Sequence, residues 1–111
     1  MRESGLFPTK HTYSIIIRAM GNVGHTEKAL QFFDMMKKQR LCLDVVSFNI
    51  LFSCLGKNGQ LQEMMKRFIE MTTYGILPDS VTFHTMMASF GKQKNIDGMK
   101  RMFGLMKKMK V

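Results

Sequence analysis

A period of 35 residues runs through the chain and limits its fold more than any other feature of the sequence. Residues of one type or size return at this spacing at several phases of the period. The positions that agree are Tyr13, Phe48 and Phe83; Gly21, Gly56 and Gly91; Phe33, Phe68 and Phe103; and Met36, Met71 and Met106. Agreement at this many positions without a gap indicates an array of structural repeats, each of which packs on its neighbours.

Each unit begins with an amphipathic helix, and the second unit shows this best. Its apolar residues recur at spacings of three, four and seven, which is the pattern of a helix with one buried face. The buried face is expected to hold Phe48, Leu51, Phe52 and Leu55, and another face to hold Val46, Asn49, Ile50, Ser53 and Cys54. The segment 56–59 is expected to end this helix, because glycine and asparagine tolerate a left-handed turn.

A second helix of the same unit is expected from about Leu61 to Thr73, before Gly75 and Pro78. Its apolar stripe is predicted to consist of Leu61, Met64, Met65, Phe68, Ile69 and Met71. One helix pair does not bury two such stripes by itself, whereas a stack of pairs does. The sequence therefore predicts an all-α superhelix with first helices on one surface and second helices on the other.

The charge of the chain favours a polyanionic partner. The 17 Lys and Arg residues outnumber the 8 Asp and Glu residues, which gives a net charge of +9. An excess of this size favours nucleic acid, or an acidic membrane or protein surface. A basic shell that serves only solubility is the alternative. No apolar run has the length needed to cross a bilayer.

The residue types that carry catalysis or bind metals are not grouped in this sequence. Paired carboxylates, a Cys/His dyad, zinc-ligand spacing and a phosphate-binding glycine loop are all absent. The 3 histidines occupy different phases of the repeat. Cys42 and Cys54 lack CxxC spacing and are predicted to be reduced structural residues. We therefore expect a non-catalytic module without a cofactor, a metal or a small-molecule substrate.

Four short motifs of the second unit resemble a known repeat family. They are Val46-Ser47-Phe48-Asn49, Gly56-Lys57-Asn58-Gly59, Phe68-Ile69-Glu70-Met71 and Gly75-Ile76-Leu77-Pro78-Asp79. This pattern is similar to the pentatricopeptide repeat (PPR) in its P-type form, and the resemblance implies a right-handed α-α superhelix, or solenoid. The tetratricopeptide repeat, with its period of 34, has a tryptophan signature that this chain lacks, since it contains no Trp.

The resemblance also divides the chain into units. Residues 10–44 and 45–79 are predicted to be PPR repeats, with Leu43 where the first is expected to have proline. Residues 80–111 are predicted to be a PPR repeat that is incomplete at its C-terminal end, with Lys94 in place of the second glycine. Residues 1–9 match the tail of a preceding repeat, so the chain is expected to be a piece of a longer array.

The family binds single-stranded RNA with one base per repeat, and the resemblance implies base-selecting residues at the fifth and last positions. These are Ser14 with Asp44, Asn49 with Asp79, and His84, whose partner is absent from the sequence. A carboxylate accepts from the two N–H groups of guanine, whereas the Asn49 amide matches the mixed edge of uracil. The family's pattern thus gives 5′-GU-3′. The alternative is that Asp44 and Asp79 are helix N-caps and that Ser14 and Asn49 are solvated polar residues.

The resemblance also implies residues that pack against the faces of the bases and residues that contact the phosphates. The second position, which packs against bases in the family, is filled by His11, Val46 and Val81. The end of the first helix, which contacts phosphate, is filled by Lys57 and Lys92. Asn22 takes this place in the first unit, so no lysine is offered to a phosphate there.

Three functions are consistent with this sequence. The first is a single-stranded RNA-binding array in organellar RNA metabolism (processing, splicing, stability or translation), in the mitochondrion or chloroplast. The second is a structural subunit of an organellar ribosome or other ribonucleoprotein, held to ribosomal RNA and proteins by shape and charge. The third is a helical protein-binding scaffold. None of the three involves a membrane.

Overall fold

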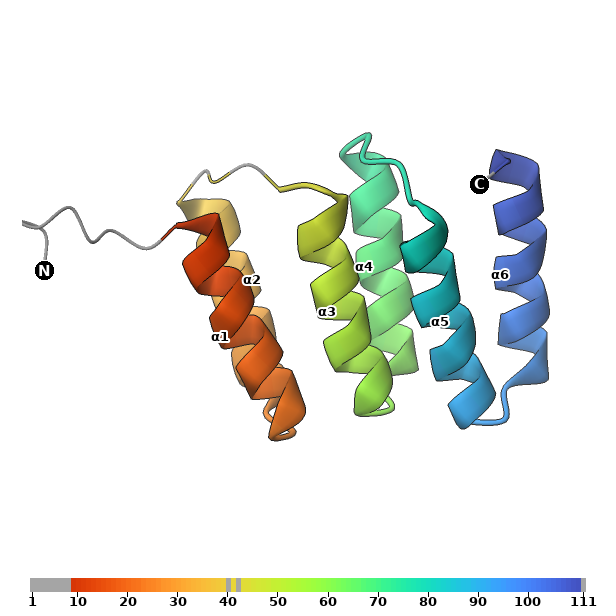
Figure 1. Ribbon diagram of the computed structural model, residues 1–111, viewed down its shortest axis with the longest axis horizontal. Helices are drawn as coiled ribbons and strands as arrows, with labels where there is room; N and C mark the ends of the chain where they lie inside the picture. The colour runs from red at the N-terminus through yellow and green to blue at the C-terminus, as the bar shows by residue number, and fades with distance from the viewer. Residues whose placement is uncertain (1–8, 40, 42, 111) are drawn as a thin grey trace, which may run out of the picture.

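The computed structural model of the protein describes residues 9–39, 41 and 43–110. This part of the chain forms six α-helices without a strand: α1 (Lys10–Asn22), α2 (Thr26–Lys38), α3 (Val45–Lys57), α4 (Leu61–Thr73), α5 (Ser80–Lys92) and α6 (Ile96–Met109) (Figure 1). The predicted all-α repeat array is therefore confirmed. Residues 1–8 of the predicted N-terminal tail, and Cys42, lie outside the described residues. None of the six helices has the length and hydropathy of a membrane span.

A side chain caps the N-terminus of each first helix, again at a spacing of 35 residues. The Thr9 hydroxyl and the Asp44 and Asp79 carboxylates accept hydrogen bonds of 3.3, 3.0 and 3.0 Å from the backbone N–H three residues later. A cap of this kind adds about 1 kcal/mol of stability. The interpretation of Asp44 and Asp79 as N-caps is confirmed. Capping uses the Oδ1 atom of each carboxylate, so it does not exclude a role in binding.

The first helices form one layer of the array. α1 packs against α3, and α3 packs against α5, so that the three lie side by side (Figure 1). α2 and α4 pack on α1 and α3 from behind in this view, while α6 packs on α5. The outward faces of α1, α3 and α5 therefore adjoin one another on a single surface.

Gly56 lies inside α3, where the lack of a side chain lets two first helices approach each other closely. A Cβ atom at this position would lie 1.8 Å from Ser89 Oγ and 2.7 Å from Ser89 Cβ on α5. Gly21 of α1 has the same relation to α3, since its Cβ would lie 2.5 Å from Cys54 Sγ. Of the segment 56–59 that is predicted to end the helix, Gly56 therefore stays helical, and Gly59 makes the left-handed turn with φ 72°.

Aromatic rings join the two helix layers into one core. Phe33 of α2 contacts Phe48 of α3 with 5.0 Å between ring centroids, and Phe68 of α4 contacts Phe83 of α5 at 6.1 Å. Phe52 continues the series between Phe48 and Phe68, at 6.0 and 6.3 Å. Each second helix thus packs on the first helix of the next unit. The face of α3 that the sequence predicts to be apolar is fully buried: Phe48, Leu51, Phe52 and Leu55.

The prediction that Ile69 belongs to the buried stripe of α4 is wrong, because this side chain is 60% exposed. α4 buries Met64, Phe68 and Met71, which follow one another at spacings of four and three. Ile69 lies about 100° around the helix from Phe68 and so leaves that stripe. Phe103 of α6 is the counterpart of Phe68 and is also exposed. Phe68 packs on the first helix of the next unit, whereas no described first helix follows α6.

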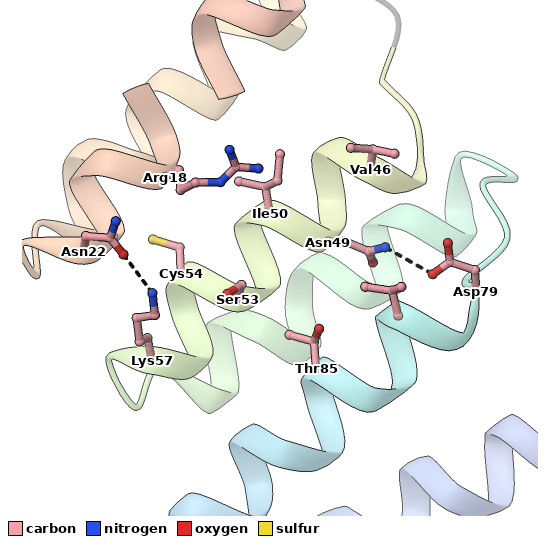
Figure 2. A pocket seen from close by; sticks show the side chains of 12 residues that line it. Arg18, Asn22, Val46, Asn49, Ile50, Ser53, Cys54, Lys57, Asp79 and Thr85 are labelled. Atoms are coloured by element: carbon pink, nitrogen blue, oxygen red, sulfur yellow. Dashed lines mark hydrogen bonds between the residues drawn. The ribbon is translucent and has the colours of Figure 1, made fainter. Parts of the chain in front are cut away.

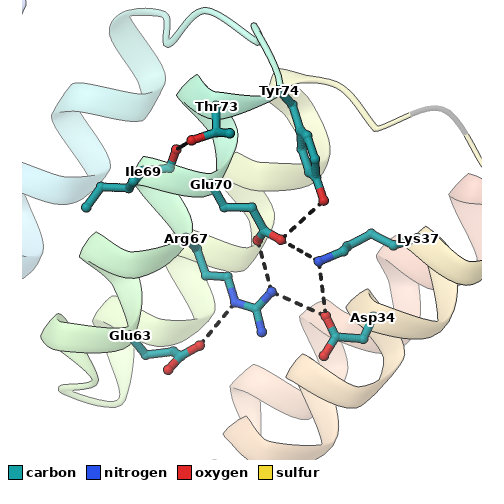
Figure 3. Close-up of polar contacts among 8 residues, drawn as sticks. All are labelled: Asp34, Lys37, Glu63, Arg67, Ile69, Glu70, Thr73 and Tyr74. Atoms are coloured by element: carbon teal, nitrogen blue, oxygen red, sulfur yellow. Dashed lines mark hydrogen bonds and ion pairs between the residues drawn. The ribbon is translucent and has the colours of Figure 1, made fainter.

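An ionic network connects α2 and α4, the second helices that pack behind α1 and α3 (Figure 3). The Arg67 guanidinium donates to Glu63 at 3.1 Å and Glu70 at 3.0 Å, and to Asp34 of α2 at 3.2 Å. Lys37 of α2 pairs with Glu70 and lies 3.6 Å from Asp34. Burial acts to raise the pKa of Glu70, but hydrogen bonds from Lys37 and Arg67 outweigh it and lower this pKa. Charge therefore stabilises the contact between these two helices.

Candidate nucleic-acid interface

A cavity of about 390 Å³ lies on the outward surface of the first helices, between α1, α3 and α5 (Figure 2). We call it the first-helix groove. Half of the predicted site residues line it: Val46, Asn49, Lys57, Asp79 and Val81. A neighbouring cavity of about 240 Å³ between α3 and α5 is lined by Lys57 and by a further predicted residue, Lys92. The other predicted residues are not in these walls: His11, Ser14, Asp44 and His84.

The Asn49 amide is held in one orientation at the edge of the groove. Its Nδ2 atom donates a 3.1 Å hydrogen bond to Asp79 Oδ1, and its Oδ1 accepts one of 2.5 Å from the Thr82 hydroxyl. The Thr82 side chain is fully buried, so this anchor is shielded from water. An amide has two donor hydrogens and two acceptor lone pairs. One of each therefore remains for a ligand.

The Asp79 carboxylate keeps one oxygen available to the groove. Oδ1 accepts from the Thr82 backbone N–H and from Asn49, whereas Oδ2 has no hydrogen bond within the described residues. Burial acts to raise the pKa of Asp79, but these hydrogen bonds outweigh it and hold the pKa below the ordinary value. The carboxylate is thus an ionised acceptor at neutral pH.

The first predicted pair, Ser14 and Asp44, is arranged differently. Lys10 Nζ donates a 2.8 Å hydrogen bond to Asp44 Oδ2, and Ser47 donates to Asp44 Oδ1. Burial acts to raise the pKa of Asp44, but the hydrogen bonds from Lys10 and Ser47 lower it overall. Ser14 is half-buried on α1. Both carboxylate oxygens of Asp44 are therefore already engaged, and the two repeats do not present the same site.

Two predicted packing residues lie on the groove as exposed apolar side chains. Val46 and Val81 are 58% and 54% exposed and stand at equivalent positions of α3 and α5. Both line the groove that also contains the Asn49–Asp79 pair. His11 and His84 are also exposed at the surface. The walls of the groove thus combine apolar contact area with oriented polar groups.

Lys57 is positioned by the preceding repeat. Its ammonium donates a 2.8 Å hydrogen bond to Asn22 Oδ1, the side chain that holds the equivalent place in α1 (Figure 2). Both residues are exposed and line the groove. The neutral Asn22 therefore orients a cation instead of providing one.

The sequence prediction gave no role to several groove residues, among them Arg18 and Thr85. The sequence could have indicated Arg18, because it stands four residues before Asn22 and therefore lies on the same face of α1. Cys54 also lines the groove, and burial raises the pKa of its thiol. Within the described part of the chain, no three His, Cys, Asp or Glu side chains are grouped as metal ligands.

The geometry matches that of known repeat proteins. A model of the PPR repeat family matches residues 16–56 and 43–92, and a PPR repeat model matches residues 81–111. This chain is similar to the crystal structure of the pentatricopeptide repeat protein PPR10 from maize, with 35% sequence identity over 97% of this chain and a TM-score of 0.82. PPR10 in complex with an 18-nt psaJ RNA element is 24% identical over 99% of the chain, with a TM-score of 0.89.

This chain spans 15% and 16% of the length of those two PPR10 chains. A search among curated proteins finds no match. The family matches extend from residue 16 to residue 111 and cover every helix except the first turns of α1. The chain therefore belongs to the pentatricopeptide repeat family.

Proposed function

We propose that this chain binds single-stranded RNA along the first-helix groove, one base per repeat. The observation that carries the proposal is the oriented Asn49–Asp79 pair, which leaves one donor and one acceptor of the amide unused. The exposed Val46 and Val81 side chains supply apolar surface for the faces of a base. The RNA complex of PPR10, a protein similar to this chain, supports the same class of ligand.

The second repeat suits uracil, whose pairing edge carries both an acceptor and a donor. The free Nδ2 hydrogen of Asn49 donates to a uracil carbonyl, and the unpaired Asp79 Oδ2 accepts from its N3–H. In the first repeat, Asp44 is expected to accept from guanine after its bond to Lys10 is exchanged. An ion pair that is this exposed is weak, so a base is able to displace it. The proposed preference is 5′-GU-3′, with no base assigned to His84.

The cell biology of the proposal follows from the family. We propose that the protein acts in organellar RNA metabolism, in the mitochondrion or chloroplast, where this family mostly works. Fluorescence imaging of the natural full-length protein with a C-terminal tag tests this location. A signal that stays outside both organelles would contradict it.

Base exchange in the RNA tests the binding mode. We expect Asn49→Ser to change which base is preferred at one position of a short single-stranded RNA, with an unchanged dependence on salt. Lys57→Ala is the matched control, and it should weaken binding to all RNA sequences alike. It should also lower the salt slope, which is the slope of log binding constant against log salt concentration, by about 0.7. At about 1–3 kcal/mol per stacked base, the few repeats of this chain bind weakly, so NMR titration at low salt is the suitable measurement. Wild-type protein that binds no RNA would contradict the proposal.

A structural role in a ribonucleoprotein is the second candidate, and the charge of α6 favours it. The exposed basic residues of this helix and its C-cap lie outside the groove: Lys100, Arg101, Lys107, Lys108 and Lys110. A surface of this kind suits folded RNA, such as ribosomal RNA, held by its phosphates. This candidate would be favoured if Asn49→Ser weakened binding to every RNA sequence equally and the wild type bound structured RNA tightly.

A further inference from the structure

The three first helices end at equivalent positions, but one of them ends without a charge. α1 ends at Asn22, α3 at Lys57 and α5 at Lys92, each 35 residues after the one before. The proposed function gives these positions the contact with backbone phosphates. The first repeat therefore lacks a cation at the place where the other two have one.

Arg18 brings a cation to the same face of α1. It stands four residues before Asn22, and residues at this spacing are neighbours on a helix surface. Its side chain is exposed and lines the first-helix groove together with Asn22 and Lys57 (Figure 2). Among the described residues, its guanidinium has no hydrogen bond, ion pair or ring contact. The charge of Arg18 is thus available to a ligand.

The equivalent residues of the other first helices are neutral. Ser53 of α3 and Ala88 of α5 stand 35 and 70 residues after Arg18. α1 therefore carries an arginine and then a neutral amide, whereas α3 and α5 carry a neutral residue and then a lysine. Each first helix offers one cation near its C-terminal end, on one of two consecutive turns.

We propose that Arg18 contacts a backbone phosphate of the bound RNA and replaces the lysine that position 22 lacks. This inference rests on the proposed function. A guanidinium suits a phosphate because it is always charged and donates two parallel hydrogen bonds. The polar groups that face a base edge, Asn49 and Asp79, belong to the α3–α5 side of the groove (Figure 2). The α1–α3 side, with Arg18 and the Asn22–Lys57 pair, is left for the RNA backbone.

The test measures binding of short single-stranded RNAs at several salt concentrations. In Arg18→Ser, which copies the residue of α3 at this phase, all sequences should bind about fivefold more weakly, and the salt slope should fall by about 0.7. Adding Asn22→Lys to this variant should restore both the affinity and the slope. Lys66→Ser removes a charge of the same sign from the exposed side of α4, outside the groove, and should change neither by this amount, because 0.1 M salt screens charges over about 10 Å.

A second measurement locates the contact on the RNA. A methylphosphonate linkage removes the charge of one phosphate, and it should weaken binding to the wild type at the linkage that Arg18 contacts. In Arg18→Ser this penalty should disappear at that linkage alone. Equal effects of Arg18→Ser and Lys66→Ser, or a change of base preference in Arg18→Ser, would overturn the inference and leave the proposed function standing. Absence of RNA binding by the wild type would overturn both.

Discussion

The side-chain amide of Asn49 on α3 donates a 3.1 Å hydrogen bond to the carboxylate of Asp79, the residue that caps α5. The bond joins α3 to the cap of the next first helix, and the same carboxylate oxygen accepts from the Thr82 backbone N–H. Asp79 therefore begins a helix and orients a groove amide at once. A change at Asp79 should alter both the stability of the fold and the chemistry of the groove.

The stability of the protein should depend on the charge of Asp79. Burial acts to raise its pKa, but hydrogen bonds from Thr82 and Asn49 lower it below the ordinary value. A pKa that is lower in the folded state means that the unfolded chain binds protons first, so stability is lost as the pH falls. We expect the wild type to lose stability below about pH 4. Asp79→Asn should lose less, because asparagine caps a helix equally well and does not titrate.

Urea unfolding followed by circular dichroism at pH 7, 5, 4 and 3 measures this difference. Asp79→Ala is the control that also removes the cap, and it should cost about 1 kcal/mol at pH 7. Wild-type and Asp79→Asn curves that stay parallel over the whole range would show that the fold does not stabilise the ionised carboxylate.

Gly56→Ala should destabilise the array by about 1–3 kcal/mol, because the new Cβ overpacks the contact between α3 and α5. It would lie 2.7 Å from Ser89 Cβ, and rotating the serine hydroxyl does not relieve that contact. Gly91→Ala is the matched control, since its Cβ meets only the flexible Met99 side chain, at 3.4 Å. That variant should be neutral, or up to about 1 kcal/mol more stable through helix propensity. Thermal unfolding of both variants tests the difference, and equal melting temperatures would contradict it.

Lys94→Gly should stabilise the protein by about 0.5–1 kcal/mol. Lys94 turns the chain between α5 and α6 with φ 57°, a left-handed conformation that Gly24 and Gly59 adopt at the equivalent turns. This conformation costs a residue with a Cβ about 1–2 kcal/mol. Glycine avoids that cost but loses more conformational entropy on folding, so the net gain in stability is smaller. Gly59→Ala should act in the opposite direction. A lower unfolding midpoint in urea for Lys94→Gly would refute the assignment of strain.

Arg67→Met should cost about 1–3 kcal/mol at pH 7, between the values of buried and exposed ion pairs. The Arg67 side chain is only 11% exposed and holds Glu63, Glu70 and Asp34 together. Without it, Glu63 loses its ion-pair partner, and Lys37 is left to pair with both Asp34 and Glu70. The loss should shrink near pH 3, where carboxylates become protonated. Lys66→Met, on the exposed side of α4, should stay within about 0.5 kcal/mol of the wild type; urea unfolding at both pH values compares the two.

Local patterns explain why much of the architecture is predictable from the sequence. Helix periodicity and capping depend on residues three or four positions apart, so the buried face of α3 and the bounds of α4 follow from the chain itself. The resemblance to the repeat family also singled out Asn49, Asp79 and Lys57, and the structure brings all three to one groove. Ile69 shows the limit of this reasoning, because the width of a buried stripe depends on what packs against the helix.

The sequence by itself determined the repeat, the helices and the family. The tertiary structure decided how neighbouring repeats meet. It placed Gly56 against Ser89, joined Lys10 to Asp44 and Asn49 to Asp79, and brought Arg18 and Lys57 to one groove. The reason is physical: each of these contacts joins one first helix to the next or to its cap, so it depends on the approach and rotation of packed helices. Spacing along one chain specifies which residues share a phase, and packing specifies which of them touch.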